Sequence, residues 1–127
     1  MENLVRGLVG VVGLLGLFLA MAFWIHPEQA AARFGLQTLG PLGLASVRAD
    51  LGAMFGAVGV LSLLGAVRNR GDLLLAPMII IALALAARIF SLIMTGLSQD
   101  LIPPMVVEVV LLTILVLGRR VLPRPQA

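Results

Sequence analysis

The sequence predicts an all-α membrane protein in which four transmembrane helices form one bundle. Of its 127 residues, 61% are hydrophobic and 12% are charged, about half the share of charge in soluble domains. The apolar residues fall into four long runs, each near the roughly 20 residues that a membrane helix needs, and none alternates as a strand does. A soluble domain of this size needs more polar surface, and a disordered chain needs more charge.

The first two spans are expected at about residues 4–25 and 46–67 of one domain, residues 1–127. The first run carries no charge between Arg6 and His26. Its N-terminal part also resembles a signal peptide, with a small-residue motif near its end. We expect this segment to be retained as the first span.

The loop after the first span is expected to contain a short helix over residues 27–34. Pro27 suits the first helical position, and Gly35 suits the position that ends a helix. Trp24 precedes this loop and is typical of an anchor at the membrane interface.

The last two spans are expected at about residues 73–95 and 104–122. The third follows Asp72 and is interrupted by Arg88. The fourth contains Glu108 and begins after two prolines, which fit the first helical turn.

The positive charges predict the orientation. All basic residues are arginines, and arginines of short loops gather on the cytoplasmic side. With both termini inside, the outer side holds Arg33 and Arg48. The inner side then holds six arginines: Arg6, Arg68, Arg70, Arg119, Arg120 and Arg124. We therefore expect both termini to be cytoplasmic and the protein to lie in a bacterial inner membrane as a multi-pass protein.

Several kinds of chemistry are excluded by composition. The chain has no Cys, no Lys and one His, which excludes disulfides, thiol redox chemistry, lysine Schiff bases and bis-histidine haem. We expect no cofactor. No basic stripe with interleaved aromatic residues is present, so we expect no nucleic-acid partner. No serine has a Gly-x-Ser-x-Gly context, and no catalytic residue is assigned.

A metal site is also not expected. His26, Glu28, Asp100 and Glu108 carry ligand atoms, but no two of them have a spacing such as Glu-x-x-His. His26 before a proline is more typical of a helix cap or a loop.

Small residues in the first two spans predict close helix packing. The second span holds Gly52 and Gly56 in a GxxxG pattern, which lets membrane helices approach closely. The first span contributes four glycines: Gly7, Gly10, Gly13 and Gly16. Two interpretations stay open, a homodimer interface and packing within one bundle, and we favour the second.

Charged residues inside the predicted spans indicate function, because an ionised group in hydrocarbon is costly unless paired or hydrated. At 1.5 Å per residue, Arg88 lies about 24 Å from the inner face, counted from Asp72. Asp50 lies about 27 Å and Glu108 about 16 Å from that face by the same rise. The buried charges therefore fall in the outer half of the membrane.

Helical phase groups these residues further. Arg88, Ser91 and Thr95 share one helix face by their i, i+3, i+7 spacing, and we expect this polar stripe to face the bundle. Arg48 and Asp50 point to nearly opposite sides of their helix. We expect Asp50 or Glu108 to hold Arg88, and Arg48 to reach the interface.

These residues have three interpretations: an outward-opening pocket for a ligand head group or ion, a structural ion-pair network that fixes helix register, and a proton or ion pathway. The candidate pocket consists of six residues: Arg48, Asp50, Arg88, Ser91, Thr95 and Glu108.

Three motifs carry a resemblance to a known family. They are VRADLGAMF at residues 47–55, ARIFSL at residues 87–92, and the pair Pro103-Pro104 followed by Glu108. With them the chain resembles a family of small four-helix bacterial membrane proteins that is catalogued as a domain of unknown function and is loosely similar to DoxX-like proteins.

The resemblance covers most of the chain and implies the four-helix topology but no reaction. It singles out Arg48, Arg88, Ser91 and Glu108. Redox members of the wider group use cysteines, which this chain lacks, so quinone–thiol chemistry is not implied.

The function expected from these observations is that of a non-enzymatic accessory, binding or scaffold protein with an outward-facing polar pocket. Its expected partners are the lipid bilayer, a lipid or amphiphilic ligand, and a second copy or a larger membrane complex. A small homodimeric transporter is the alternative, and a membrane enzyme acting on a lipid or isoprenoid comes third. Small multidrug exporters use an embedded Glu in their first helix, where this chain has no acid beyond Glu2.

Overall fold

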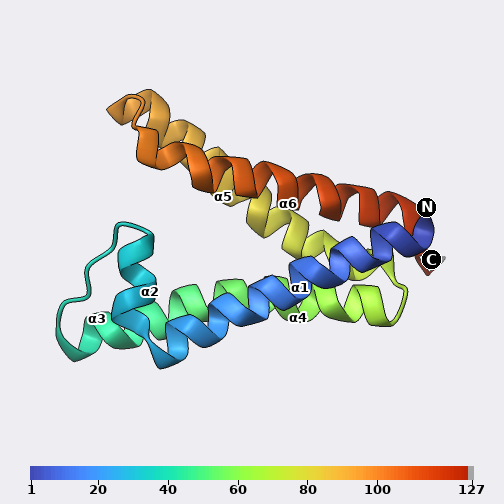
Figure 1. Ribbon diagram of the computed structural model, residues 1–127, viewed down its shortest axis with the longest axis horizontal. Helices are drawn as coiled ribbons and strands as arrows, with labels where there is room; N and C mark the ends of the chain where they lie inside the picture. The colour runs from blue at the N-terminus through green and yellow to red at the C-terminus, as the bar shows by residue number, and fades with distance from the viewer. Residues whose placement is uncertain (126–127) are drawn as a thin grey trace.

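The computed structural model describes residues 1–125 and is built from helices, without strands in that range (Figure 1). The elements in chain order are α1 (Glu2–Ile25), α2 (Pro27–Arg33), α3 (Gly40–Ser46), η1 (Val47–Leu51), α4 (Gly52–Val67), η2 (Gly71–Leu74), α5 (Leu75–Thr95), η3 (Gln99–Leu101) and α6 (Ile102–Val121). Among the described residues, four helical stretches are long and apolar enough to cross a membrane: Glu2–Ile25, Gly40–Val67, Gly71–Thr95 and Gln99–Val121. The all-helical class is confirmed, and the four stretches overlap the four predicted spans.

Two spans begin earlier than the sequence predicts. The second begins at Gly40 rather than near residue 46, because α3, η1 and α4 follow one another without a break. The fourth is preceded by the short turn η3, and its prolines stand in the first turn of α6 as expected. The short helix after the first span is present as α2, and Gly35 follows it with a φ of 73°.

Glycines let α1 and α4 pack in direct backbone contact. Gly13 lies against Leu63, and Gly16 lies against Gly59. A Cβ added to Gly16 would come within 2.7 Å of the Gly59 Cα. At these positions the small residues pack within one chain, which is the second of the two interpretations.

The other predicted packing glycines differ in their surroundings. A Cβ at Gly10 or at Gly56 would meet an alanine Cβ at an ordinary 3.7 Å, again between α1 and α4. Gly52 lies under the Trp24 indole, whereas a Cβ at Gly7 would meet nothing within 4 Å. Gly59 lies outside the GxxxG pattern and completes the α1–α4 contact three residues after Gly56.

The α5–α6 pair meets the α1–α4 pair at one end of the molecule and diverges from it toward the other (Figure 1). We call the end that holds both chain termini and residues 68–70 the closed end. The end that holds residues 26–46 and 96–101 is the open end. The buried residues of α5 are Pro77 and Ile81, both in its first half, so no residue of its second half is buried.

The closed end contains the hydrophobic core and a set of polar contacts. Val9, Leu74 and Gly118 bring α1, η2 and α6 together there. Arg6 donates from Nε to the Ala66 carbonyl and from Nη2 to the Val67 carbonyl, 2.9 Å away. These carbonyls belong to the last turn of α4, where a helix lacks its own donors. The arginine therefore caps α4 and fixes α1 to it.

Candidate functional site

The Arg88 and Glu108 side chains form an ion pair between α5 and α6. Arg88 Nε donates to Glu108 Oε1 at 2.5 Å. The Glu108 side chain is 11% exposed and that of Arg88 is 29% exposed. Of the two carboxylates that we expect as partners of Arg88, the structure brings Glu108 to it.

The hairpin between α5 and α6 sets this pairing. Gly96 ends α5 with a φ of 85°, a value that favours glycine. The Ser98 hydroxyl accepts a hydrogen bond from the Asp100 backbone N–H, which starts the turn into α6. Since the two helices run antiparallel from this turn, Arg88 and Glu108 reach the same level from opposite directions.

Hydrogen-bonding capacity is left over at the pair. Glu108 Oε2 is buried and has no hydrogen-bond partner among the described residues. The Arg88 Nη1 and Nη2 atoms donate no hydrogen bond to any other residue in the same range. A buried polar atom without a partner costs about 1–3 kcal/mol, so the pair offers an acceptor and two donors to a further group.

Ser91 and Thr95 follow Arg88 on α5 but are exposed. The Thr95 hydroxyl donates to the Ser91 carbonyl at 2.7 Å, within its own helix. We expect this polar stripe to face the bundle. The structure leaves Ser91 and Thr95 uncovered instead, because α1 and α4 diverge from α5 at this level (Figure 1).

Arg48 and Asp50 lie in η1, a π-helical turn on the other helix pair. Arg48 Nε donates to the Trp24 carbonyl at 3.1 Å, and Trp24 Nε1 donates to the Arg48 carbonyl at 3.1 Å. These reciprocal bonds join the C-terminal end of α1 to η1. Asp50 is exposed and forms no ion pair with any residue in the described range.

The six candidate residues therefore divide into two groups. Arg88 and Glu108 lie between α5 and α6, beside Ser91 and Thr95, whereas Arg48 and Asp50 belong to η1. Of the six, Arg48 lines one of the two pockets described below, and the other five line neither.

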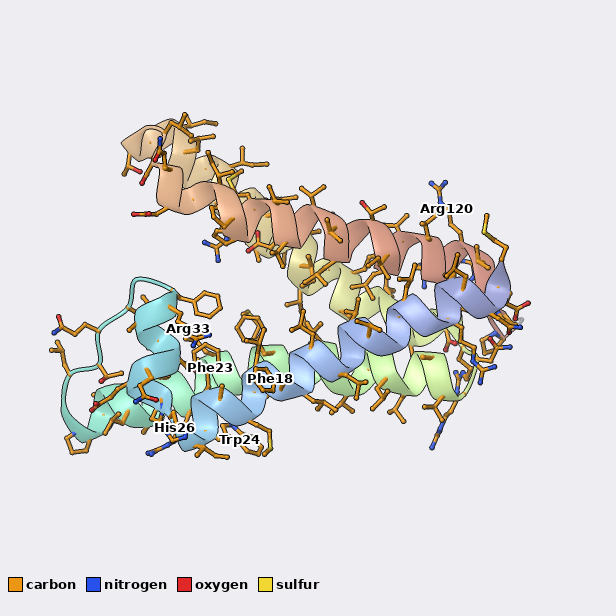
Figure 2. The ribbon with its side chains drawn as sticks, in the orientation of Figure 1. Phe18, Phe23, Trp24, His26, Arg33 and Arg120 are labelled. Atoms are coloured by element: carbon orange, nitrogen blue, oxygen red, sulfur yellow. The ribbon has the colours of Figure 1, made fainter. Side chains whose placement is uncertain are left out.

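The open end contains two pockets that the sequence does not predict. One, of about 270 Å³, is lined by Ile25, His26, Pro27, Glu28, Gln29, Leu44 and Arg48. The other, of about 160 Å³, is lined by Phe18, Leu19, Ala22, Phe23, His26, Gln29, Ala30, Arg33 and Phe34. In Figure 2, Arg33 lies on the side of α2 nearer to the α5–α6 pair, and His26 and Trp24 lie on the side away from it.

Three phenylalanines hold α2 in place beside these pockets. The rings of Phe23, Phe34 and Phe55 have centroids 5.5–5.6 Å apart and come from α1, the end of α2, and α4. Aromatic pairs at such distances add stability beyond their buried area. Sequence reasoning missed this cluster, because the three residues share no periodic spacing.

The described residues hold no group of three or more His, Cys, Asp or Glu side chains placed to bind a metal ion. His26 therefore does not share a metal site with Glu28, Asp100 and Glu108 in this part of the chain.

Comparisons with protein-family models, with curated proteins and with solved structures found no match to this chain. The four long apolar helices define the class as a helical, multi-pass membrane protein by length and composition.

Proposed function

We propose that this chain is a non-enzymatic binding protein that takes up a neutral amphiphile whose head group carries a hydroxyl. The head group binds at Arg88 and Glu108, and the apolar part lies along the uncovered outer halves of α5 and α6. The observation that carries this proposal is the ion pair with unused donors on Arg88 and an unused acceptor on Glu108.

The chemistry of the pair selects the ligand class. Arg88 and Glu108 together are close to neutral, and a charged ligand in hydrocarbon adds a charge that nothing offsets. A hydroxyl adds no charge, accepts from an Arg88 terminal nitrogen and donates to Glu108 Oε2. Phe90, Ile93 and Val106 lie near this level and are 65%, 75% and 55% exposed. They supply an apolar surface for the ligand's chain.

The test is photolabelling with a C16 alcohol that carries a diazirine in its chain, applied to the purified protein in detergent. We expect saturable labelling of α5 and α6 near residues 88–108, mapped by peptide mass spectrometry. The double variant Arg88→Leu with Glu108→Leu leaves no lone charge and should lose this labelling while staying folded. Thr113→Val is the matched control, because the Thr113 hydroxyl donates to the Val109 carbonyl of its own helix.

Two outcomes contradict the proposal. One is labelling of the double variant equal to that of the original chain. The other is stronger competition by the C16 carboxylate than by the unlabelled alcohol, which assigns the site to anions.

We further propose that the closed end faces the cytoplasm of a bacterial cell and that the protein lies in its inner membrane. Both termini are at the closed end (Figure 1), together with the arginines of residues 68–70 and 119–124. Arg33 and Arg48 are at the open end. This asymmetry follows the rule that arginines of short loops stay inside.

A further inference from the structure

The larger pocket of the open end is lined by two opposite charges that do not form an ion pair with each other. Arg48 and Glu28 both line this pocket of about 270 Å³. Neither forms an ion pair with any residue in the described part of the chain. His26 and Gln29 add further polar atoms to its wall. A pocket with separated positive and negative groups complements a ligand that carries both charges.

One nitrogen of the Arg48 guanidinium, Nε, is held by a hydrogen bond within the protein. This nitrogen is bonded to the Trp24 carbonyl, and the Arg48 carbonyl is bonded to the Trp24 indole. Gly52 leaves room for that indole, because any Cβ there would collide with it. The terminal nitrogens of Arg48 have no acceptor among the described residues, so they remain available for a bidentate bond to a phosphate.

The surroundings place this pocket at head-group level. Ile25 lines the pocket and Trp24 precedes it in the chain, and their side chains are 59% and 57% exposed. An exposed tryptophan at the end of a span is typical of the membrane interface. A pocket of this size is smaller than the roughly 300–1,000 Å³ of pockets that enclose whole ligands. It fits a head group whose chains remain in the bilayer.

We infer that this pocket binds the head group of a zwitterionic phospholipid of the phosphoethanolamine type. The phosphate lies on the terminal nitrogens of Arg48, and the primary ammonium lies on the Glu28 carboxylate. The ligand makes no use of Arg88 or Glu108, so this inference does not depend on the proposed function.

The single tryptophan of the chain provides the measurement, because its indole is bonded to the backbone of Arg48. Trp24 emission is followed in detergent while three soluble dihexanoyl phospholipids are added: phosphatidylethanolamine, phosphatidylcholine and the anionic phosphatidylglycerol. Free phosphoethanolamine is a fourth ligand. We expect a saturable change with phosphatidylethanolamine and at least tenfold tighter binding than with phosphatidylglycerol.

Glu28→Gln is the decisive variant. Glu28 is exposed, so its replacement should not disturb folding, and it removes the partner of the ammonium group. We expect the preference to be lost or reversed toward phosphatidylglycerol, because Arg48 alone favours an anion. Arg33→Gln is the matched control, an arginine of the same end that does not line this pocket, and it should keep the preference.

Two results overturn the inference: equal affinity of the original chain for phosphatidylethanolamine and phosphatidylglycerol, or an unchanged preference in Glu28→Gln. Free phosphoethanolamine that binds as tightly as the lipid supports the site chemistry and assigns a soluble zwitterion as its source. The labelling experiment at Arg88 and Glu108 tests the proposed function, and its failure would not change any result of the Trp24 titrations. The two proposals can therefore fail separately.

Discussion

Arg88 lies seven residues before the end of α5 and Glu108 six residues after the start of α6, and each is tolerated because the other is beside it. Removing one partner of a buried ion pair leaves an uncompensated charge and costs about 3–5 kcal/mol. We expect Glu108→Gln to lower the free energy of unfolding by about 3 kcal/mol, measured by chemical unfolding in mixed micelles.

The double variant Arg88→Leu with Glu108→Leu separates the pair from its individual charges. We expect it to recover most of the stability lost in Glu108→Gln, because no lone charge remains in the apolar surroundings. A double variant as unstable as the single one would mean that the pair itself, and not the removal of a stray charge, holds α5 and α6 together.

Gly52 is predicted to control the position of Trp24. A Cβ at residue 52 collides with the indole, whereas one at Gly56 meets the Ala20 Cβ at 3.7 Å. Gly52→Ala should therefore break the bond from Trp24 to the Arg48 carbonyl and shift the tryptophan emission maximum, and Gly56→Ala should leave the emission unchanged. Identical spectra for the two variants would contradict the reciprocal contact between α1 and η1.

The contact between α1 and α4 depends on backbone-to-backbone approach at Gly13, Gly16 and Gly59. Gly16→Ala forces the helices apart, because its Cβ would lie 2.7 Å from Gly59 backbone atoms. We expect a loss of about 1–3 kcal/mol, as for other overpacked sites, with an unchanged mass in detergent.

Gly7→Ala is the control for this helix pair. Its Cβ meets nothing within 4 Å, and replacing a glycine inside a helix by alanine stabilises by up to about 1 kcal/mol. A shift toward a smaller oligomer in Gly16→Ala would instead indicate that this glycine seam also joins two chains.

Both termini lie at the closed end, so one labelling experiment tests the orientation of the entire bundle. We expect a cysteine at Gln37, in the loop of the open end, to react with an impermeant maleimide added to intact cells. A cysteine at Pro125 should react only after the cells are permeabilised. The reverse pattern would overturn the proposed orientation and place Arg88 in the cytoplasmic half of the membrane.

Much of the fold follows from local chemistry. Runs of about 20 apolar residues must form helices in a membrane, because no water is present to satisfy the backbone. Helix ends such as Gly35 and the prolines before Met105 follow from the dihedral angles that these residues favour. Depth along a helix follows from its rise, so the sequence also predicts that Arg88, Asp50 and Glu108 lie in the same half of the membrane.

Which helices face each other depends on contacts between residues far apart in the chain. The sequence leaves both Asp50 and Glu108 open as partners of Arg88, since each carries a carboxylate in the same half of the membrane. Because the α5–α6 pair diverges from the α1–α4 pair, Arg88 pairs with Glu108 of the adjacent helix. The same divergence leaves Asp50, Ser91 and Thr95 exposed. The pocket between Arg48 and Glu28 likewise exists because the Phe23, Phe34 and Phe55 rings hold α2 against the end of the bundle. Such packing has no periodic signal, because side-chain shapes at distant positions fit one another only once the chain is folded.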